Sequence, residues 1–94
     1  MRQSLLETRG IVHWSDLRAH AARGAILIVG EALDIVVAGE AMARDDVQKV
    51  EAWVASALLR KPTVEDLEAW SRDASAAWDC IVVAPWVLVK THLQ

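Results

Sequence analysis

The sequence predicts an α+β fold, in which a small, mostly antiparallel sheet of about three strands packs against three to four helices. Two kinds of segment support this. Ala25–Val29 and Trp78–Lys90 are short runs rich in β-branched and other apolar residues, as buried strands are. The stretches between them carry apolar residues at helical spacing behind capping residues. A chain of 94 residues is typical of one domain, here 1–94, with an expected core from about residue 14 to residue 90.

Two helices are predicted before the first strand. A short one covers residues 3–9. The next begins with Ser15 as its N-cap, carries Leu17 and Ala21 at helical spacing, and ends before Gly24. The strand Ala25–Val29 follows, with five consecutive apolar residues. This part of the chain therefore predicts a helix that leads directly into a buried strand.

The segment from Ala32 to Ala43 allows two interpretations. Ile35–Gly39 has the composition of a second strand in a hairpin. As a helix, the segment places Leu33, Val36, Val37 and Ala41 on one stripe, while Gly39 costs about 1 kcal/mol relative to alanine. We prefer the helix.

The clearest predicted element is a helix capped by Asp45 or Asp46. Its apolar residues form an amphipathic stripe that should be buried on one face. The stripe comprises Val47, Val50, Trp53, Val54, Ala57 and Leu58.

The last third of the chain should contain two extended pieces and one helix. Residues 58–61 should be extended, because the residue before a proline is pushed out of the helical region. Thr63 and Asp66 form a capping box, and Leu67 and Trp70 should face inward. Trp78–Lys90 is strand-like, and Pro85 marks a bulge, a bend or an edge within it.

From Trp14 to Lys90 the chain resembles a small bacterial family known as domain of unknown function 2288. The most specific motifs are DDVxxVxxW at Asp45–Trp53 and APWVLV at Ala84–Val89. The resemblance supports a helix over Ala32–Ala43. It implies no activity, substrate or catalytic residue.

Composition argues against several classes of function. The net charge is −3 with scattered basic residues, whereas nucleic-acid surfaces gather lysine and arginine. No apolar run is long enough to span a bilayer, and the N-terminus lacks a signal-peptide core, so we expect a cytoplasmic protein without membrane contact. The single cysteine, Cys80, has apolar neighbours and should be buried and unreactive.

Motifs for catalysis, metal binding or cofactor binding are missing from the sequence. It contains no nucleophile elbow, phosphate loop, dinucleotide fingerprint or clustered His and Cys ligands. We therefore expect no catalytic residue, no metal and no cofactor. Two alternatives stay open. One is a ligand or metal site built from the acidic residues Glu31, Asp34, Glu40, Asp45 and Asp46. The other is a degenerate winged-helix DNA-binding domain over Val47–Trp70.

The preferred hypothesis is a non-catalytic interaction or assembly module that self-associates. Its candidate interaction residues are Trp14, Trp86, Asp45 and Asp46. Tryptophans at the ends of elements suit interfaces as well as cores. The apolar strands lack polar alternation, so both sheet faces need cover, and a second copy in a homodimer would supply part of it.

Overall fold

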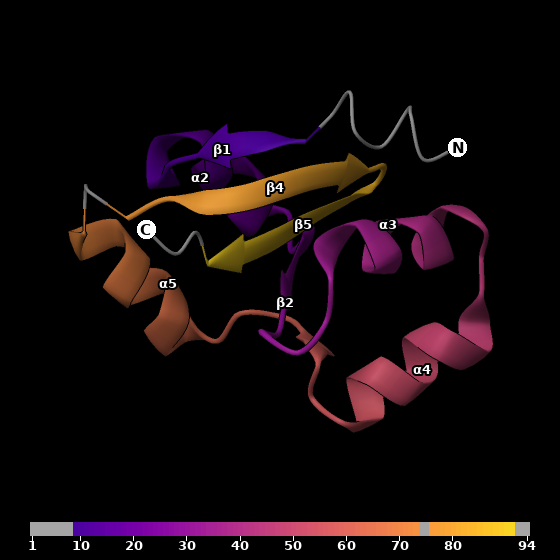
Figure 1. Ribbon diagram of the computed structural model, residues 1–94. Coiled ribbons are helices and arrows are strands. Elements are labelled where there is room, and N and C mark those ends of the chain that lie inside the picture. Colours follow the sequence, from indigo (N-terminus) through magenta and orange to yellow (C-terminus); the bar gives the residue numbers. More distant parts are fainter. Residues whose placement is uncertain (1–8, 74–75, 92–94) are drawn as a thin grey trace.

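The computed structural model describes residues 9–73 and 76–91, and these form four helices and one five-stranded sheet (Figure 1). The helix expected over residues 3–9 lies outside them, apart from Arg9. The elements in chain order are β1 (Gly10–Val12), α2 (Trp14–Ala22), β2 (Ile26–Val29), α3 (Ile35–Ala43), α4 (Val47–Ala55), β3 (Leu59–Arg60), α5 (Val64–Arg72), β4 (Trp78–Val83) and β5 (Trp86–Thr91). The predicted α+β class is confirmed.

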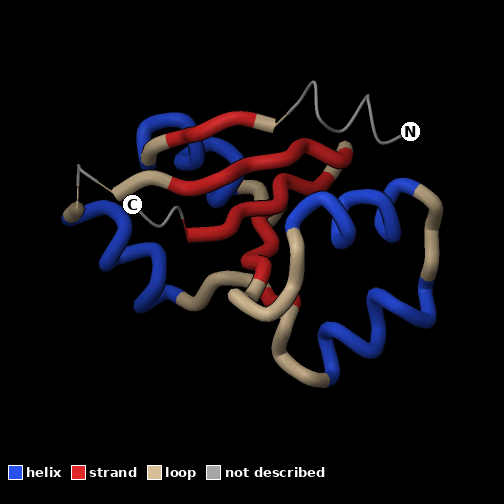
Figure 2. The backbone as a smooth tube through the Cα atoms, viewed as in Figure 1, coloured by secondary structure: helices blue, strands red, loops and turns tan. Residues whose placement is uncertain are grey.

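The sheet is mixed, with strand order β1-β4-β5-β2-β3 (Figure 2). β1 with β4, β4 with β5, and β2 with β3 are antiparallel pairs, whereas β2 and β5 are parallel. The sheet is therefore mostly antiparallel, as predicted, but it has five strands rather than about three. β5, the last strand in sequence, lies in the middle.

Two differences explain the extra strands. Trp78–Lys90 is a hairpin rather than one interrupted strand, because the chain reverses at Ala84 and Pro85, and Val83 pairs with Trp86. β1 was missed because it is only three residues long and begins with a glycine, which carries no strand signal. It is ordered by pairing with β4, from Gly10 opposite Cys80 to Val12 opposite Trp78.

Helices of the same chain cover both faces of the sheet, and each face has its own core cluster. One cluster lies under α3, with α4 beside it: Val29, Leu33, Ile35, Val36, Ala38, Leu59, Ile81 and Leu88. The other lies under α2 and α5: Leu17, Ile26, Trp78, Cys80, Val87 and Val89. Consecutive residues of β5 thus enter opposite cores, because side chains alternate along a strand. This accounts for the apolar runs in β2, β4 and β5.

The helical interpretation of Ala32–Ala43 is confirmed and the hairpin interpretation is wrong. α3 begins after Asp34, whose carboxylate accepts hydrogen bonds from the backbone N–H groups of Val36 and Val37 at 2.7 and 3.3 Å. Gly39 lies in its buried face. Burial of this face against the sheet outweighs the low helix propensity of glycine and valine.

The start of α2 differs from the prediction by two residues. The helix begins at Trp14 with His13 as N-cap, and Asp16 accepts a hydrogen bond from the His13 N–H at 3.0 Å. Ser15 lies inside the first turn. The helix ends as predicted, with Gly24 in the left-handed region at φ +68°.

The apolar stripe of α4 is less buried than its spacing predicts. No residue of this helix is fully buried, and Val47 and Val54 are 59% and 55% exposed. Val50 and Trp53 pack partly against the core. The helix also ends at Ala55, so Ala57 and Leu58 follow it. α4 therefore leaves one side of its apolar face uncovered.

The end of α4 provides a stability test. Ala57 occupies the left-handed region at φ 61°. Its N–H donates to the carbonyl of Val54, and the N–H of Leu58 donates to the carbonyl of Trp53, and these bonds end the helix. A side chain is unfavourable there and glycine is usual. We predict that Ala57→Gly raises the free energy of unfolding by about 1 kcal/mol, measured by urea denaturation. Ala52→Gly, inside the same helix, should lower it by about 1 kcal/mol, and a lower value for both variants would contradict the prediction.

The capping box of α5 is confirmed, and Arg60 forms an additional hydrogen bond with it. The Asp66 carboxylate accepts a hydrogen bond from the Thr63 N–H at 2.9 Å, and the Thr63 hydroxyl accepts one from the Asp66 N–H at 3.1 Å. The Arg60 guanidinium donates to Asp66 at 2.8 Å. The hydrogen bond from Arg60, followed by that from Thr63, lowers the pKa of Asp66.

Because this pKa is lowered in the folded state, Asp66 stabilises the fold above its usual pKa of about 4, and the contribution is lost as pH falls through the lowered value. We predict that Asp66→Asn destabilises the protein by about 1 kcal/mol at pH 7, and that this difference shrinks as pH falls below about 4. Urea denaturation at several pH values measures this. Glu65→Gln, in the same turn, is the control. A difference independent of pH would contradict the prediction.

Candidate functional site

A groove lies between α4 and the β4–β5 turn, and it encloses about 270 Å³. The end of α3, the start of α4 and the turn itself supply its walls. Its lining residues are Met42, Asp45, Val47, Val50, Glu51, Val83, Ala84, Pro85 and Trp86. Seven of the nine are apolar, and the two polar ones are both carboxylates. The groove is therefore an apolar trough with a negative rim.

Trp86 forms one wall of the groove and is held in place by two features. It is the first residue of β5 and pairs with Val83, so the adjacent turn fixes its backbone. The Lys61 ammonium lies 5.5 Å from the centroid of its ring, in a cation–π contact. Lys61 is not among the groove-lining residues. The ring thus has a defined place with part of its surface available to a ligand, because Trp86 is only partly buried.

Asp45 stands at the mouth of the groove in an unusual backbone conformation. Its φ is +56°. Its N–H donates to the carbonyl of Met42, and the N–H of Asp46 donates to the carbonyl of Ala41, and these bonds end α3. This is the position where glycine or asparagine usually ends a helix. The side chain of Asp45 is exposed, and no hydrogen bond or ion pair to it is found within residues 9–73 and 76–91.

Glu51 is the second carboxylate of the rim and comes from the first two turns of α4. It is exposed, and within the described part of the chain it has no ion-pair partner. Asp46, one residue after Asp45, has a structural role, because it caps α4 by accepting from the Lys49 N–H at 3.3 Å, and its carboxylate lies 3.8 Å from the Lys49 ammonium. Of the predicted residues, the groove thus joins Trp86 and Asp45, with Asp46 adjacent.

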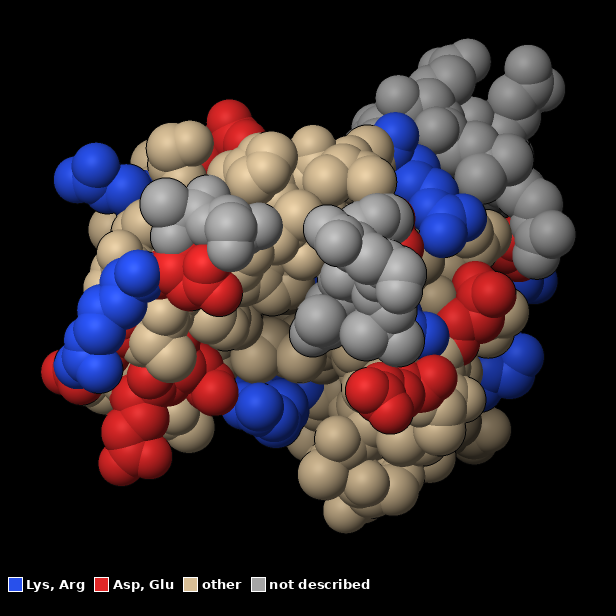
Figure 3. All heavy atoms as spheres, turned by 60° about the vertical axis from the view of Figure 1, so that its left-hand side comes forward, with Lys and Arg blue, Asp and Glu red and all other residues tan. Residues whose placement is uncertain are grey.

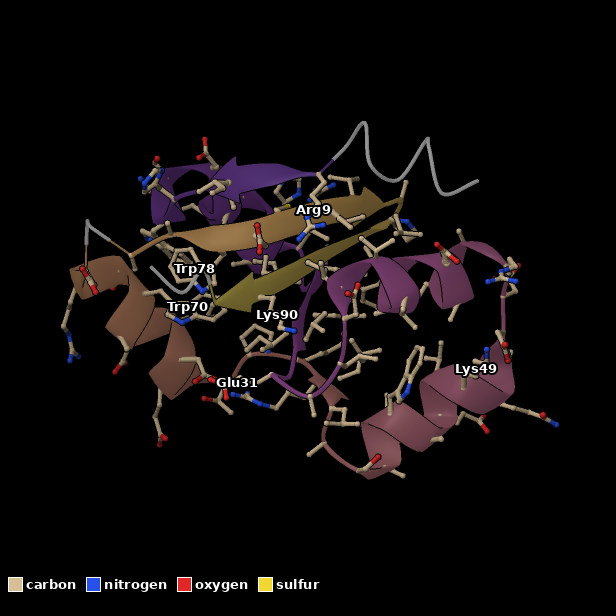
Figure 4. The ribbon with its side chains drawn as sticks, in the orientation of Figure 1. Arg9, Glu31, Lys49, Trp70, Trp78 and Lys90 are labelled. Atoms are coloured by element: carbon tan, nitrogen blue, oxygen red, sulfur yellow. The ribbon has the colours of Figure 1, made fainter. Side chains whose placement is uncertain are left out.

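Trp14 belongs to a different part of the molecule. Its ring meets that of Trp70 edge-on at 6.2 Å between centroids, and Trp70 lies 5.0 Å from Trp78. Figure 4 shows Trp70 and Trp78 side by side between α5 and β4. These contacts place Trp14 in the packing of α2 and α5 against the sheet, so it is not brought together with the other predicted residues.

A polar cluster occupies the carboxyl ends of the parallel strands β2 and β5, where α/β sheets often bind ligands. The Lys90 ammonium donates to the carbonyls of Leu33 at 2.6 Å and Glu31 at 3.2 Å, and it points from β5 toward the turn before α3 (Figure 4). The pKa of Asp34 is lowered first by its hydrogen bond from Val36, and further by Val37, Arg9 and Lys90. Each of these bonds fixes the start of α3, so the cluster positions the fold.

Comparison with known proteins agrees with this architecture. Residues 1–91 match the family model described as protein of unknown function DUF2288. The chain belongs to this family. The resemblance inferred from the motifs at Asp45–Trp53 and Ala84–Val89 is therefore correct. Both motifs contribute to the groove, because the first supplies Asp45 and Glu51 and the second supplies Pro85 and Trp86.

A solved structure has the same fold as this DUF2288 protein. It is the NMR solution structure of PA1075 from Pseudomonas aeruginosa, with a TM-score of 0.83 and 34% sequence identity. The match covers 97% of this chain and 83% of the other. A search of curated proteins finds no match.

The acidic residues considered as a metal site are dispersed in this DUF2288 fold. Asp34 and Asp46 cap helices, and Glu40 lies 3.3 Å from Arg44. Glu31 lies in the turn before α3. Within residues 9–73 and 76–91, no three His, Cys, Asp or Glu residues lie close enough to hold a metal ion.

Cys80 is buried under α2, as predicted. Burial, and then the nearby Asp16 carboxylate, raises the pKa of the thiol. This disfavours the nucleophilic thiolate. Its lack of reactivity stays a prediction.

The described residues on the face shown in Figure 3 give no support to a nucleic-acid interface. On the face shown in Figure 3, lysine and arginine side chains alternate with aspartate and glutamate rather than forming one basic patch. α4 packs with α3 and β3, whereas α5 packs with α2, and the two helices pack against the cores on opposite faces of the sheet (Figure 1). The two helices of the proposed winged-helix segment are therefore not packed together. None of the helices in the described ranges has the length and apolar character to cross a bilayer.

Most of the groove was not predicted from the sequence. The spacing of Val47 and Val50 predicts burial in a stripe, and no sequence motif marks Glu51, Val83 or Pro85 as site residues. The available signals were the position of Val47 directly after the capping Asp46, and the proline beside Trp86. Neither indicates that the two segments meet, since they lie far apart in sequence.

Proposed function

We propose that this DUF2288 protein is a non-catalytic interaction module that binds another polypeptide, a second copy or a different protein, in the groove between α4 and the β4–β5 turn. The observation that carries the proposal is the apolar lining of the groove between Trp86 and the uncovered side of α4. Binding sites in interfaces combine an aromatic anchor, an apolar floor and a polar rim. Trp86, Val50 and Glu51 are residues of these three kinds.

The positions of the apolar residues extend this surface beyond the groove. Val47 lines the groove and Val54 lies two helical turns further along α4, and both are more than half exposed. Exposed valines at this spacing lie on one side of a helix. A partner that enters the groove would thus meet both valines on one side of α4, with Glu51 between them.

Site-specific photo-cross-linking tests the proposal. With a photoreactive amino acid in place of Glu51, we predict that irradiation of the intact producing cells gives a discrete cross-linked product containing the protein. The second change Val47→Glu, which puts a charge on the groove wall, should remove the product. The same photoreactive residue in place of Glu65, on α5, is the control. Products of equal yield from both positions, or none from position 51, would contradict the proposal.

A homodimer is one form of this function. The apolar strands that first suggested it are covered by helices of the same chain, so the dimer now depends on the exposed valines of α4. If a second copy binds, light scattering coupled to size exclusion gives twice 10.4 kDa for the wild type at micromolar concentration. Val54→Glu should restore the monomer, whereas Val64→Glu, on α5 and 72% exposed, should not. A constant 10.4 kDa across a dilution series would reject the homodimer and leave binding to a different protein.

A further inference from the structure

The charges around the groove distinguish between its possible partners. Asp45 and Glu51 are the charged residues of its lining, and both are negative and exposed. Within the described residues neither carboxylate has an ion-pair partner. The groove therefore offers an apolar surface and two negative charges that are free to pair with a ligand.

The neighbouring cations do not neutralise this rim. Lys49 lies 3.8 Å from Asp46, and Arg44 lies 3.3 Å from Glu40. Lys61 lies against the ring of Trp86 and outside the groove lining. These contacts give each cation a partner other than Asp45 or Glu51.

The backbone of Asp45 allows its carboxylate to be removed without disturbing the fold. A glycine would end α3 in the same left-handed conformation, at φ +56°, without the cost of a side chain. Aspartate adopts this conformation more readily than most residues, so binding is inferred from the groove and its charges. Asp45→Gly therefore tests what the carboxylate itself contributes.

We infer that the groove binds an apolar side chain of another protein, from a segment in which lysine or arginine flanks that side chain. This inference rests on the proposed function and specifies its partner. The apolar side chain would lie between Trp86 and Val47, and the flanking ammonium or guanidinium groups would pair with Asp45 and Glu51. Electrostatic complementarity of this kind sets partner choice and association rate.

A second copy of this chain fits the groove less well. In a two-fold contact both copies use the same patch, so the carboxylates of both grooves would lie in one interface. Like charges brought together at an interface are unfavourable. A segment with flanking cations removes this repulsion and adds attraction.

NMR titration of the ¹⁵N-labelled protein tests the inference, with the indole N–H signal of Trp86 as the local reporter. The probes are three pools of short peptides with a central Leu, Met, Ile or Val, flanked by lysine, serine or glutamate. We expect saturable shifts of the Trp86 signal with the lysine-flanked pool and binding about tenfold weaker with the glutamate-flanked pool. The preference should decrease as salt is added.

Three variants separate charge from apolar packing. Asp45→Gly and Glu51→Gln should each weaken binding of the lysine-flanked pool severalfold, and together remove its advantage over the serine-flanked pool. Glu65→Gln, on α5, is the matched control and should bind like the wild type. Val47→Ser should weaken all three pools alike. Asp45→Gly should melt no lower than the wild type, so its effect on binding would not come from unfolding.

The other outcomes are also decisive. The three pools could bind equally well, with Val47→Ser weakening each of them. That result would overturn the inference about charge and leave the proposed function standing. No shift of the Trp86 signal with any pool would overturn the inference. Shifts of this signal on dilution of the protein alone would show that a second copy fills the groove, which also overturns the inference but supports an interaction module.

Discussion

The parallel pairing of β2 with β5 is the constraint on which the rest of this fold depends. Ile26–Ile28 pair with Val87–Val89, although the two strands are separated by most of the chain. The segment between them contributes β3 and β4 to the sheet, and it places α3 and α4 on one face and α5 on the other. β5 then becomes the central strand, and Leu88 and Val89 are completely buried in opposite cores.

This arrangement shows what apolar periodicity predicts and what it leaves open. The runs in β2 and β5 correctly indicated that both sheet faces are covered. They did not indicate whether the cover comes from the same chain or from a second copy, because burial has the same signature in both cases. The stripe of α4 has the same limit. Its spacing identified the apolar side of the helix but did not indicate whether that side is covered, and Val47 and Val54 are exposed. The capping box was more specific, since Thr63 begins a helix as predicted.

The candidate site was predictable only in part, for a related reason. Trp86 and Asp45 were selected as single residues from their chemical character and position. Their proximity arises because the turn after α3 and the turn between β4 and β5 meet at the same end of the molecule, and it depends on long-range strand order. Local sequence signals carry no such information. Trp14 shows the opposite case, since its character suited an interface and its contacts with Trp70 place it in packing.

The two ends of α4 illustrate how stability and binding can be separated in this molecule. Asp45 before the helix and Ala57 after it both occupy the left-handed region, where neither residue is favoured. Ala57 is exposed and lies outside the groove, so its conformation brings no evident benefit to a ligand. Asp45 has the same backbone strain but carries a carboxylate at the groove mouth. The variants Ala57→Gly and Asp45→Gly therefore relieve the same backbone conformation. Only the second also removes a carboxylate from the groove lining, so a comparison of the two separates stability from binding.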